Sequence, residues 1–173
     1  MDVMIDIEGL ATGPEATILT IAAQGFDPLS SGYFSQHQYY ARITLESQPN
    51  RTIEQSTIDW WATQKEAQAE AFAEDGRVDL DVALQDLARL VRKCTRVWMN
   101  GPTYDATILE NAYKSYNFAL PWYYYSVRDA RTVYSLHPYL DRPPTSHHAL
   151  EDCRRQIYLL QECLSHLKIK ELK

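Results

Sequence analysis

The chain has 173 residues, of which 45% are hydrophobic and 12% aromatic, and its formal net charge is −6. This length suits one hydrophobic core, so we expect residues 1–173 to form a single domain. The longest apolar runs are only a few residues, too short for a membrane span, and Met1–Asp6 lacks the order of a signal peptide. The acidic balance argues against a protein that holds long duplexes by neutralising many phosphates, because that mode needs a basic face.

Three cysteines, Cys94, Cys153 and Cys163, show none of the spacings that make a zinc site. Their odd number leaves one thiol without a partner. We therefore expect reduced thiols and a cytoplasmic location.

The first part of the chain is predicted to contain three strands joined by short turns. Val3–Ile7 is an apolar run that the turn at Gly9–Pro14 ends, which predicts a buried strand with an acidic C-terminal end. Ile18–Phe26 and Tyr33–Ile43 predict the second and third strands. Three strands with short connections favour a meander.

Helices and strands then alternate, which predicts an α/β fold with a mixed sheet. The first predicted helix is Ala62–Ala73, and Trp60 and Trp61 open it. The other predicted helices are Leu80–Val91, Asp105–Tyr116, Arg128–Tyr134, and a last helix from His148 to about Leu167. The predicted strands are Arg96–Met99 and Trp122–Val127. Three prolines are expected to keep Leu136–Ser146 irregular.

Asp6 and Glu8 are separated by one residue, so on a strand both side chains point to the same face. Such a pair also occurs by chance in an acidic chain, where it is a solvated strand end. The apolar run before it favours a functional role, because carboxylates that close a buried strand need a partner or a metal ion to offset desolvation.

Two further carboxylates lie near predicted helix starts. Asp105 follows a strand through a polar loop, and it is either a first-turn helix acid or part of a site. Asp152 lies in the last helix, one turn after His148 and five residues after His147. Each of these residues alone is more often a surface or capping residue than a functional one.

Taken together, these residues resemble the motifs of the DEDDh exonucleases. That family carries D-x-E on its first strand, an Asp at the start of a middle helix, and H-x4-D in a late helix. This sequence supplies Asp6 and Glu8, then Asp105, then His147–Asp152, in that order over almost the whole chain. The resemblance implies a ribonuclease H-like fold, with a mixed five-stranded sheet flanked by helices. It also implies a 3'-5' exonuclease that releases nucleoside monophosphates from the 3' end of single-stranded DNA or RNA.

Within the family, the chain looks similar to the compact phage and bacterial branch related to exonuclease VIII and phage exodeoxyribonuclease A. Three segments carry this likeness, namely Thr57–Gln64, Gly101–Asp105 and Arg128–Thr132. The chain departs from the pattern at Gly9, where relatives often carry Thr.

The resemblance also implies a site with two Mg²⁺ or Mn²⁺ ions about 4 Å apart. Asp6 would contact both ions, Glu8 and Asp152 would complete the site of the nucleophile, and Asp105 would hold the second ion. His147 is the expected general base, because the family places the base five residues before the last Asp. Gly9 and Leu10 would line the terminal nucleotide, and Tyr104 and His148 are further candidates for substrate contact.

Some alternatives stay open. Tyr104 is either a stacking residue or a packed aromatic, and Arg128 and Arg131 either meet phosphate or pair with Asp129. Other candidate functions are hydrolysis of nucleotide caps or very short oligonucleotides, and a non-catalytic module that binds nucleic acid or a partner. The aromatic helix after Trp60 is a candidate homodimer interface.

Overall fold

The computed structural model describes residues 1–172, and a five-stranded sheet lies at its centre, with the strand order β3-β2-β1-β4-β5. The strands are β1 (Asp2–Gly9), β2 (Ile18–Phe26), β3 (Tyr33–Arg42), β4 (Val97–Met99) and β5 (Val127–Asp129). β1, β2 and β3 pair antiparallel as a meander, whereas β1 with β4 and β4 with β5 pair parallel. The prediction of a mixed five-stranded α/β sheet is therefore confirmed.

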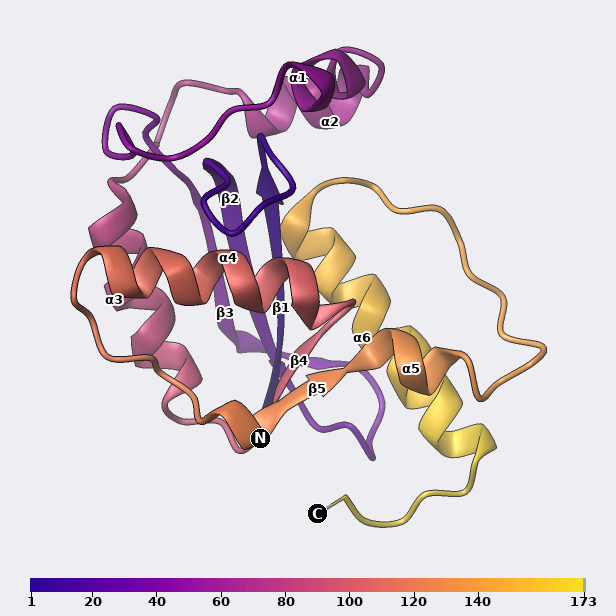
Figure 1. Cartoon of the computed structure of the whole chain (residues 1–173). Helices are drawn as coiled ribbons and strands as arrows, with labels where there is room; N and C mark the ends of the chain where they lie inside the picture. The colour runs from indigo at the N-terminus through magenta and orange to yellow at the C-terminus, as the bar shows by residue number, and fades with distance from the viewer. Residues whose placement is uncertain (173) are drawn as a thin grey trace.

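Helices cover both faces of this sheet (Figure 1). They are α1 (Gln55–Trp61), α2 (Lys65–Ala71), α3 (Leu80–Val91), α4 (Pro102–Ser115), α5 (Ala130–Tyr134) and α6 (Ala149–His166), with a 3-10 turn η1 (Tyr124–Ser126) before β5. One core cluster joins the sheet to α3 and α4, and a second joins it to α5 and α6. In Figure 1, α1 and α2 lie at the top, beyond the end of the sheet to which β1 points.

The side chains of β1 alternate between the two cores. Val3, Ile5 and Ile7 belong to the cluster with α3 and α4, and Met4 belongs to the cluster with α6. Because alternate residues of a strand share a face, Asp6 and Glu8 lie on the α6 side of the sheet. The strand therefore carries both acids towards the start of α6.

The helix predicted over Ala62–Ala73 is present but shorter, as α2, and a separate helix that was not predicted, α1, precedes it. Trp61 ends α1 instead of opening a helix, and α2 begins at Lys65. The indole of Trp61 is fully buried, and its Nε1 donates a hydrogen bond of 3.1 Å to the Gly9 carbonyl. This anchor fixes α1 against the end of β1, and the chain turns before α2.

The final strand also differs from its prediction at Trp122–Val127. Strand pairing begins only at Val127, opposite Val97, and β5 ends at Asp129. β4 is three residues long, so a longer neighbour would have no strand to pair with. The helix predicted over Arg128–Tyr134 accordingly begins later, at Ala130, where the Asp129 side chain accepts a hydrogen bond from the Arg131 N–H.

Within residues 1–172, no helix has both the length and the apolar character needed to cross a membrane.

Candidate active site

Asp105 is tied directly to β1. It lies in the first turn of α4, 4% exposed, and its Oδ1 accepts a hydrogen bond of 3.2 Å from the N–H of Ile7. Ile7 is the residue between Asp6 and Glu8 on β1. The hydrogen bond therefore brings three carboxylates to the same end of the central strand.

Asp152 holds the loop that precedes α6. Its carboxylate accepts hydrogen bonds from the Thr145 hydroxyl at 2.6 Å, the Ser146 N–H at 3.1 Å and the His147 N–H at 2.8 Å. The Nε of Arg155 also donates to it, at 3.1 Å. His147 has a left-handed backbone, with φ 55°, so these bonds hold a conformation that L-residues rarely adopt.

All four predicted acids and His147 line one pocket of about 340 Å³. Ligand atoms of Glu8, His147 and Asp152 lie within 4.8 Å of one another, a spacing that suits a shared metal ion. Asp6, Glu8 and Asp105 come from the sheet end and α4, whereas His147 and Asp152 come from the start of α6. The site is thus assembled from both ends of the chain.

The two neighbouring histidines point to different places. His147 lines the pocket, and its ring meets Trp60 edge to face, with a centroid distance of 4.8 Å. His148 stacks on Tyr40 at 4.8 Å, and its Nε2 lies 4.0 Å from a carboxylate oxygen of Glu70. His148 therefore packs against β3 and α2, and it is not among the residues that line the pocket.

Burial raises the pKa of three of the site carboxyls, Asp6, Glu8 and Asp105. Burial, reinforced by Asp105 and Glu8, raises the pKa of Asp6 well above its usual value. Burial and the charges of Asp152 and Asp105 raise the pKa of Glu8 to about 8. Burial raises the pKa of Asp105 to about 7, although the N–H of Ile7 partly opposes this. A cation among such groups would favour their ionised forms at neutral pH.

Several polar residues of the pocket were not predicted from the sequence. The Nε2 of Gln156 donates a 2.8 Å hydrogen bond to Asp6, and the other amide atom, Oε1, is buried without a partner. Gln156 follows Asp152 by four residues on α6, so helical spacing already placed both on one face. Thr145 also lines the pocket, and its loop position gave no periodicity from which to predict it.

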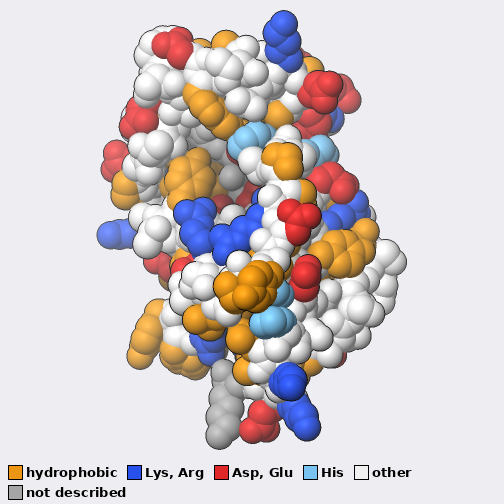
Figure 2. All heavy atoms as spheres, turned by 90° about the vertical axis from the view of Figure 1, so that its right-hand side faces the viewer, with side chains coloured by type: hydrophobic (Ala, Val, Ile, Leu, Met, Phe, Trp, Pro, Cys, Tyr) orange, Lys and Arg blue, Asp and Glu red, His pale blue; other side chains and the backbone are white. Residues whose placement is uncertain are grey.

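Positive charge also reaches the pocket, through Arg131 and Arg155. Figure 2 shows a group of basic side chains near the middle of the face formed by α5, α6 and the loop between them. Arg131 donates to the Asn100 carbonyl at 2.8 Å, and Asp129 caps α5. The side chain of Arg131 therefore lies at the pocket.

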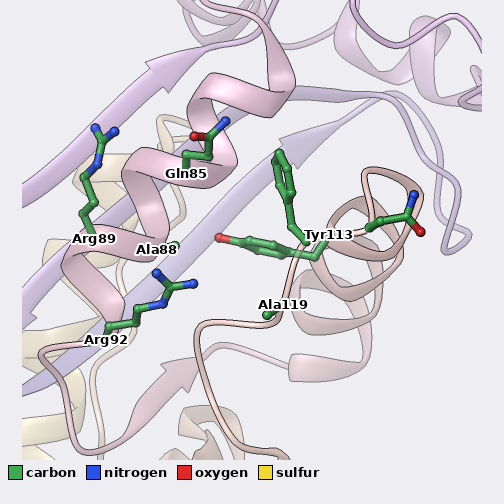
Figure 3. A pocket seen from close by; sticks show the side chains of 8 residues that line it. Gln85, Ala88, Arg89, Arg92, Tyr113 and Ala119 are labelled. Atoms are coloured by element: carbon green, nitrogen blue, oxygen red, sulfur yellow. The ribbon is translucent and has the colours of Figure 1, made fainter.

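A second cavity, of about 350 Å³, lies between α3 and α4 (Figure 3). Arg89 and Arg92 of α3 line it, with Tyr113 across from them on α4. The described residues that line it include no carboxylate and no histidine. This cavity lacks the ligands that the first pocket offers to a metal ion.

A family model described as the 3'-5' exoribonuclease Rv2179c-like domain matches residues 1–164. The chain belongs to this family. The crystal structure of cell-death related nuclease 4 (CRN-4) is similar to it, with a TM-score of 0.60 and 11% sequence identity. The match covers 96% of this chain and 64% of the CRN-4 chain, and it shows the expected ribonuclease H-like fold. No match was found among curated proteins.

Leu10 and Tyr104 are two of the residues that the sequence predicted to contact substrate, and they lie in different surroundings. Leu10 is 1% exposed and packs with Leu19, Trp61 and Ala71, so its side chain faces the interior. Tyr104 lines the pocket, and its hydroxyl donates to the Ala11 carbonyl at 3.4 Å. Of these two, only Tyr104 lies where a nucleotide in the pocket would meet it.

Gly9 is needed for a close approach. A Cβ at this position would lie 2.9 Å from the Tyr104 hydroxyl and 3.1 Å from the Thr17 carbonyl oxygen. The register of β1 against β2 also shifts between Glu8 and Gly9. A Thr at this position would therefore clash with Tyr104 in this chain.

Replacing Gly9 with Ala is expected to destabilise the fold by about 1–3 kcal/mol, because the added methyl group overpacks this contact. Urea unfolding at neutral pH measures the change. Adding Tyr104→Phe removes the nearer of the two contacts and should restore part of the loss. A Gly9→Ala protein as stable as wild type would show that Tyr104 moves freely.

The metal-free protein is expected to lose stability as the pH rises. Its folded state holds the pKa of Glu8 at about 8 instead of 4.5 and that of Asp105 at about 7 instead of 3.8. Between the ordinary and the raised pKa values, the folded state binds more protons than the unfolded state. The protonated forms of Glu8 and Asp105 therefore stabilise the fold at low pH, and this stabilisation is lost as pH rises through about 7–8.

Thermal unfolding in a chelator should give a midpoint lower by about 5 °C or more at pH 8.5 than at pH 5.5. Glu8→Gln should flatten this dependence, because the amide does not ionise. A midpoint that rises with pH in both proteins would contradict the clustering of unpaired carboxyls.

Proposed function

We propose that this chain is a metal-dependent 3'-5' exonuclease of the DEDDh type, which releases nucleoside monophosphates from the 3' end of single-stranded nucleic acid. The observation that carries the proposal is the convergence of Asp6, Glu8, Asp105, Asp152 and His147 on one pocket. The family description favours RNA as the substrate. Kinship with the exonuclease VIII branch stays a prediction.

The residues of the pocket fit a pair of divalent cations. Asp6, Glu8, Asp105 and Asp152 offer only oxygen ligands, which Mg²⁺ and Mn²⁺ prefer. The raised pKa values of three of these carboxyls indicate a site with more negative charge than it can hold alone. Asp6, Glu8, Asp105 and Asp152 would hold such ions, and these would supply Lewis acidity for activating water and for stabilising the leaving 3'-oxygen.

His147 is suited to accept the proton of the attacking water. Burial lowers its pKa, so the imidazole is neutral at neutral pH and can accept a proton. The charge of Asp152 opposes this shift and stabilises the imidazolium that forms. Gln156 orients Asp6, and the N–H of Ile7 orients Asp105.

The nearby arginines suit a phosphodiester substrate. Arg131 and Arg155 line the same pocket as the acids, so phosphate oxygens would meet both positive side chains and cations there. A module that only binds nucleic acid would not require four converging carboxylates beside a histidine of lowered pKa.

The test is release of mononucleotides from a 5'-labelled single-stranded RNA, with Mg²⁺, with Mn²⁺ and with a chelator. We expect a ladder of products shortened from the 3' end, with no products in the chelator. A DNA strand and a capped nucleotide serve as parallel substrates. Activity on the cap alone would replace the proposal with the cap hydrolase, and inactivity with either metal on every substrate would overturn it.

A further inference from the structure

Three consecutive tyrosines, Tyr123, Tyr124 and Tyr125, project into solvent immediately before β5. Their exposed fractions are 69%, 88% and 60%. The rings of Tyr123 and Tyr125 stack in parallel, with centroids 5.2 Å apart and planes inclined by 5°, and Tyr124 meets Tyr125 edge to face. An exposed aromatic cluster of this kind marks a binding surface.

The backbone beneath these rings is fixed. Ser126 is buried, and both its N–H and its hydroxyl donate to the Tyr123 carbonyl, at 2.9 and 2.7 Å. The guanidinium of Arg128 donates to the Tyr125 carbonyl at 2.5 Å. The stacked pair is therefore held in place before any ligand arrives, which lowers the entropic cost of binding.

Few residues separate this cluster from Arg131, which lines the active-site pocket. β5 covers only Val127–Asp129, and Arg131, two residues later, lines the pocket. Three strand residues extend about 10 Å. Val127 pairs with Val97, and Val97 pairs with Val3, so the cluster lies towards the start of β1, whereas the acids of the pocket lie at its end. The nucleic acid between the cluster and the pocket must therefore span more than the length of β5, which is more than about three nucleotides at the 3.4 Å spacing of a stacked strand.

We propose that Tyr123 and Tyr125, with Arg128, form a stacking platform for the bases of the single strand upstream of its 3'-terminal nucleotide. The inference rests on the proposed exonuclease function. Bases would extend the column of tyrosine rings, and the positive charges of Arg128 and Arg131 would lie along the phosphates. Stacking of this type accepts any base, which suits an enzyme that degrades strands of any sequence.

A second copy of the chain suits this surface less well. β5 is an edge strand of three residues, too short to extend the sheet across an interface. A single-stranded nucleic acid would contact both the faces of the tyrosine rings and the positive charge of Arg128.

The experiment compares an RNA of about ten nucleotides, long enough to reach the platform, with a dinucleotide that is too short to do so. The variants are Tyr123→Ala/Tyr125→Ala and Tyr123→Phe/Tyr125→Phe, with Tyr158→Ala as a control, since Tyr158 is 55% exposed on α6. For the alanine pair, we expect KM for the long RNA to rise about tenfold or more. The phenylalanine pair and the control should keep the wild-type KM, and the dinucleotide should be cleaved equally by all four proteins.

Equal KM values for the alanine pair and wild type on long RNA would overturn the platform, as would an equal loss on both substrates. If light scattering shows that the alanine pair converts a dimer to a monomer while KM is unchanged, the surface belongs to a second copy. Failure of the proposed function is a separate result, because wild type would then release nothing from either substrate.

Discussion

Replacing Asp6 with Asn is expected to slow nucleotide release by about a thousandfold or more. A divalent cation contributes several kcal/mol of charge stabilisation in the transition state, and about 4 kcal/mol corresponds to a thousandfold in rate. Asp6 is the acid that the DEDDh resemblance assigns to both ions, and the amide removes its charge while keeping its shape. Single-turnover release from labelled RNA in Mg²⁺ measures the effect.

The same substitution should stabilise the metal-free protein, because one of the crowded carboxyls no longer ionises. It should also abolish the rise in melting temperature that we expect Mg²⁺ to cause in wild type. Glu151→Gln is the matched control, since Glu151 is an exposed acid on α6 that pairs with Arg154. An Asp6→Asn protein with more than a tenth of the wild-type rate would remove Asp6 from the metal site.

Replacing His147 with Asn is expected to slow release by about 10²–10⁴-fold, the usual contribution of a general base. Asn tolerates the left-handed backbone at this position better than Ala does, so the loop is preserved. The four carboxylates remain, and stabilisation by Mg²⁺ should therefore persist. If Mg²⁺ still raises the melting temperature of His147→Asn, the slower release reflects loss of the general base and not loss of metal binding.

The control for His147 is its neighbour. His148→Ala removes a ring that stacks on Tyr40 outside the pocket, so its activity should stay within about tenfold of wild type, a loss of about 1.4 kcal/mol at most. In wild type the rate should fall as the imidazole protonates, and His147→Asn should lack this limb of the pH profile. The reverse pattern, with His148 essential and His147 dispensable, would exchange the two roles.

The part of the site that the sequence predicted is the part that depends on short-range periodicity. The spacing of Asp6 and Glu8 on a strand defines one face without any knowledge of the rest of the fold. The place of Asp152 in the last helix follows from helical spacing in the same way. Their convergence with Asp105 was expected only from the family resemblance, because it depends on the hydrogen bond from Ile7.

The errors lie where tertiary contacts override local preference. Tyr123–Tyr125 have high strand propensity, yet β4 is too short to pair with them, and the chain forms the 3-10 turn Tyr124–Ser126 instead. The helical preference of the Ala- and Glu-rich stretch was expected to begin right after Trp61, yet Trp61 ends α1 with its indole buried against Gly9, and α2 begins only at Lys65. In both cases a partner distant in sequence decides the outcome.

The two faces of β1 have opposite energetic effects. Val3, Ile5 and Ile7 are almost fully buried, and each contributes about 1.5–3 kcal/mol by leaving water. The other face of the same strand holds Asp6 and Glu8 close to like charges, which opposes folding. Aliphatic burial thus keeps mutually repelling groups together until a cation arrives. If the proposed ions bind here, removing them should lower the stability of the folded protein as well as stop its activity, and small losses of side-chain volume at Ile5 should then have their largest effect.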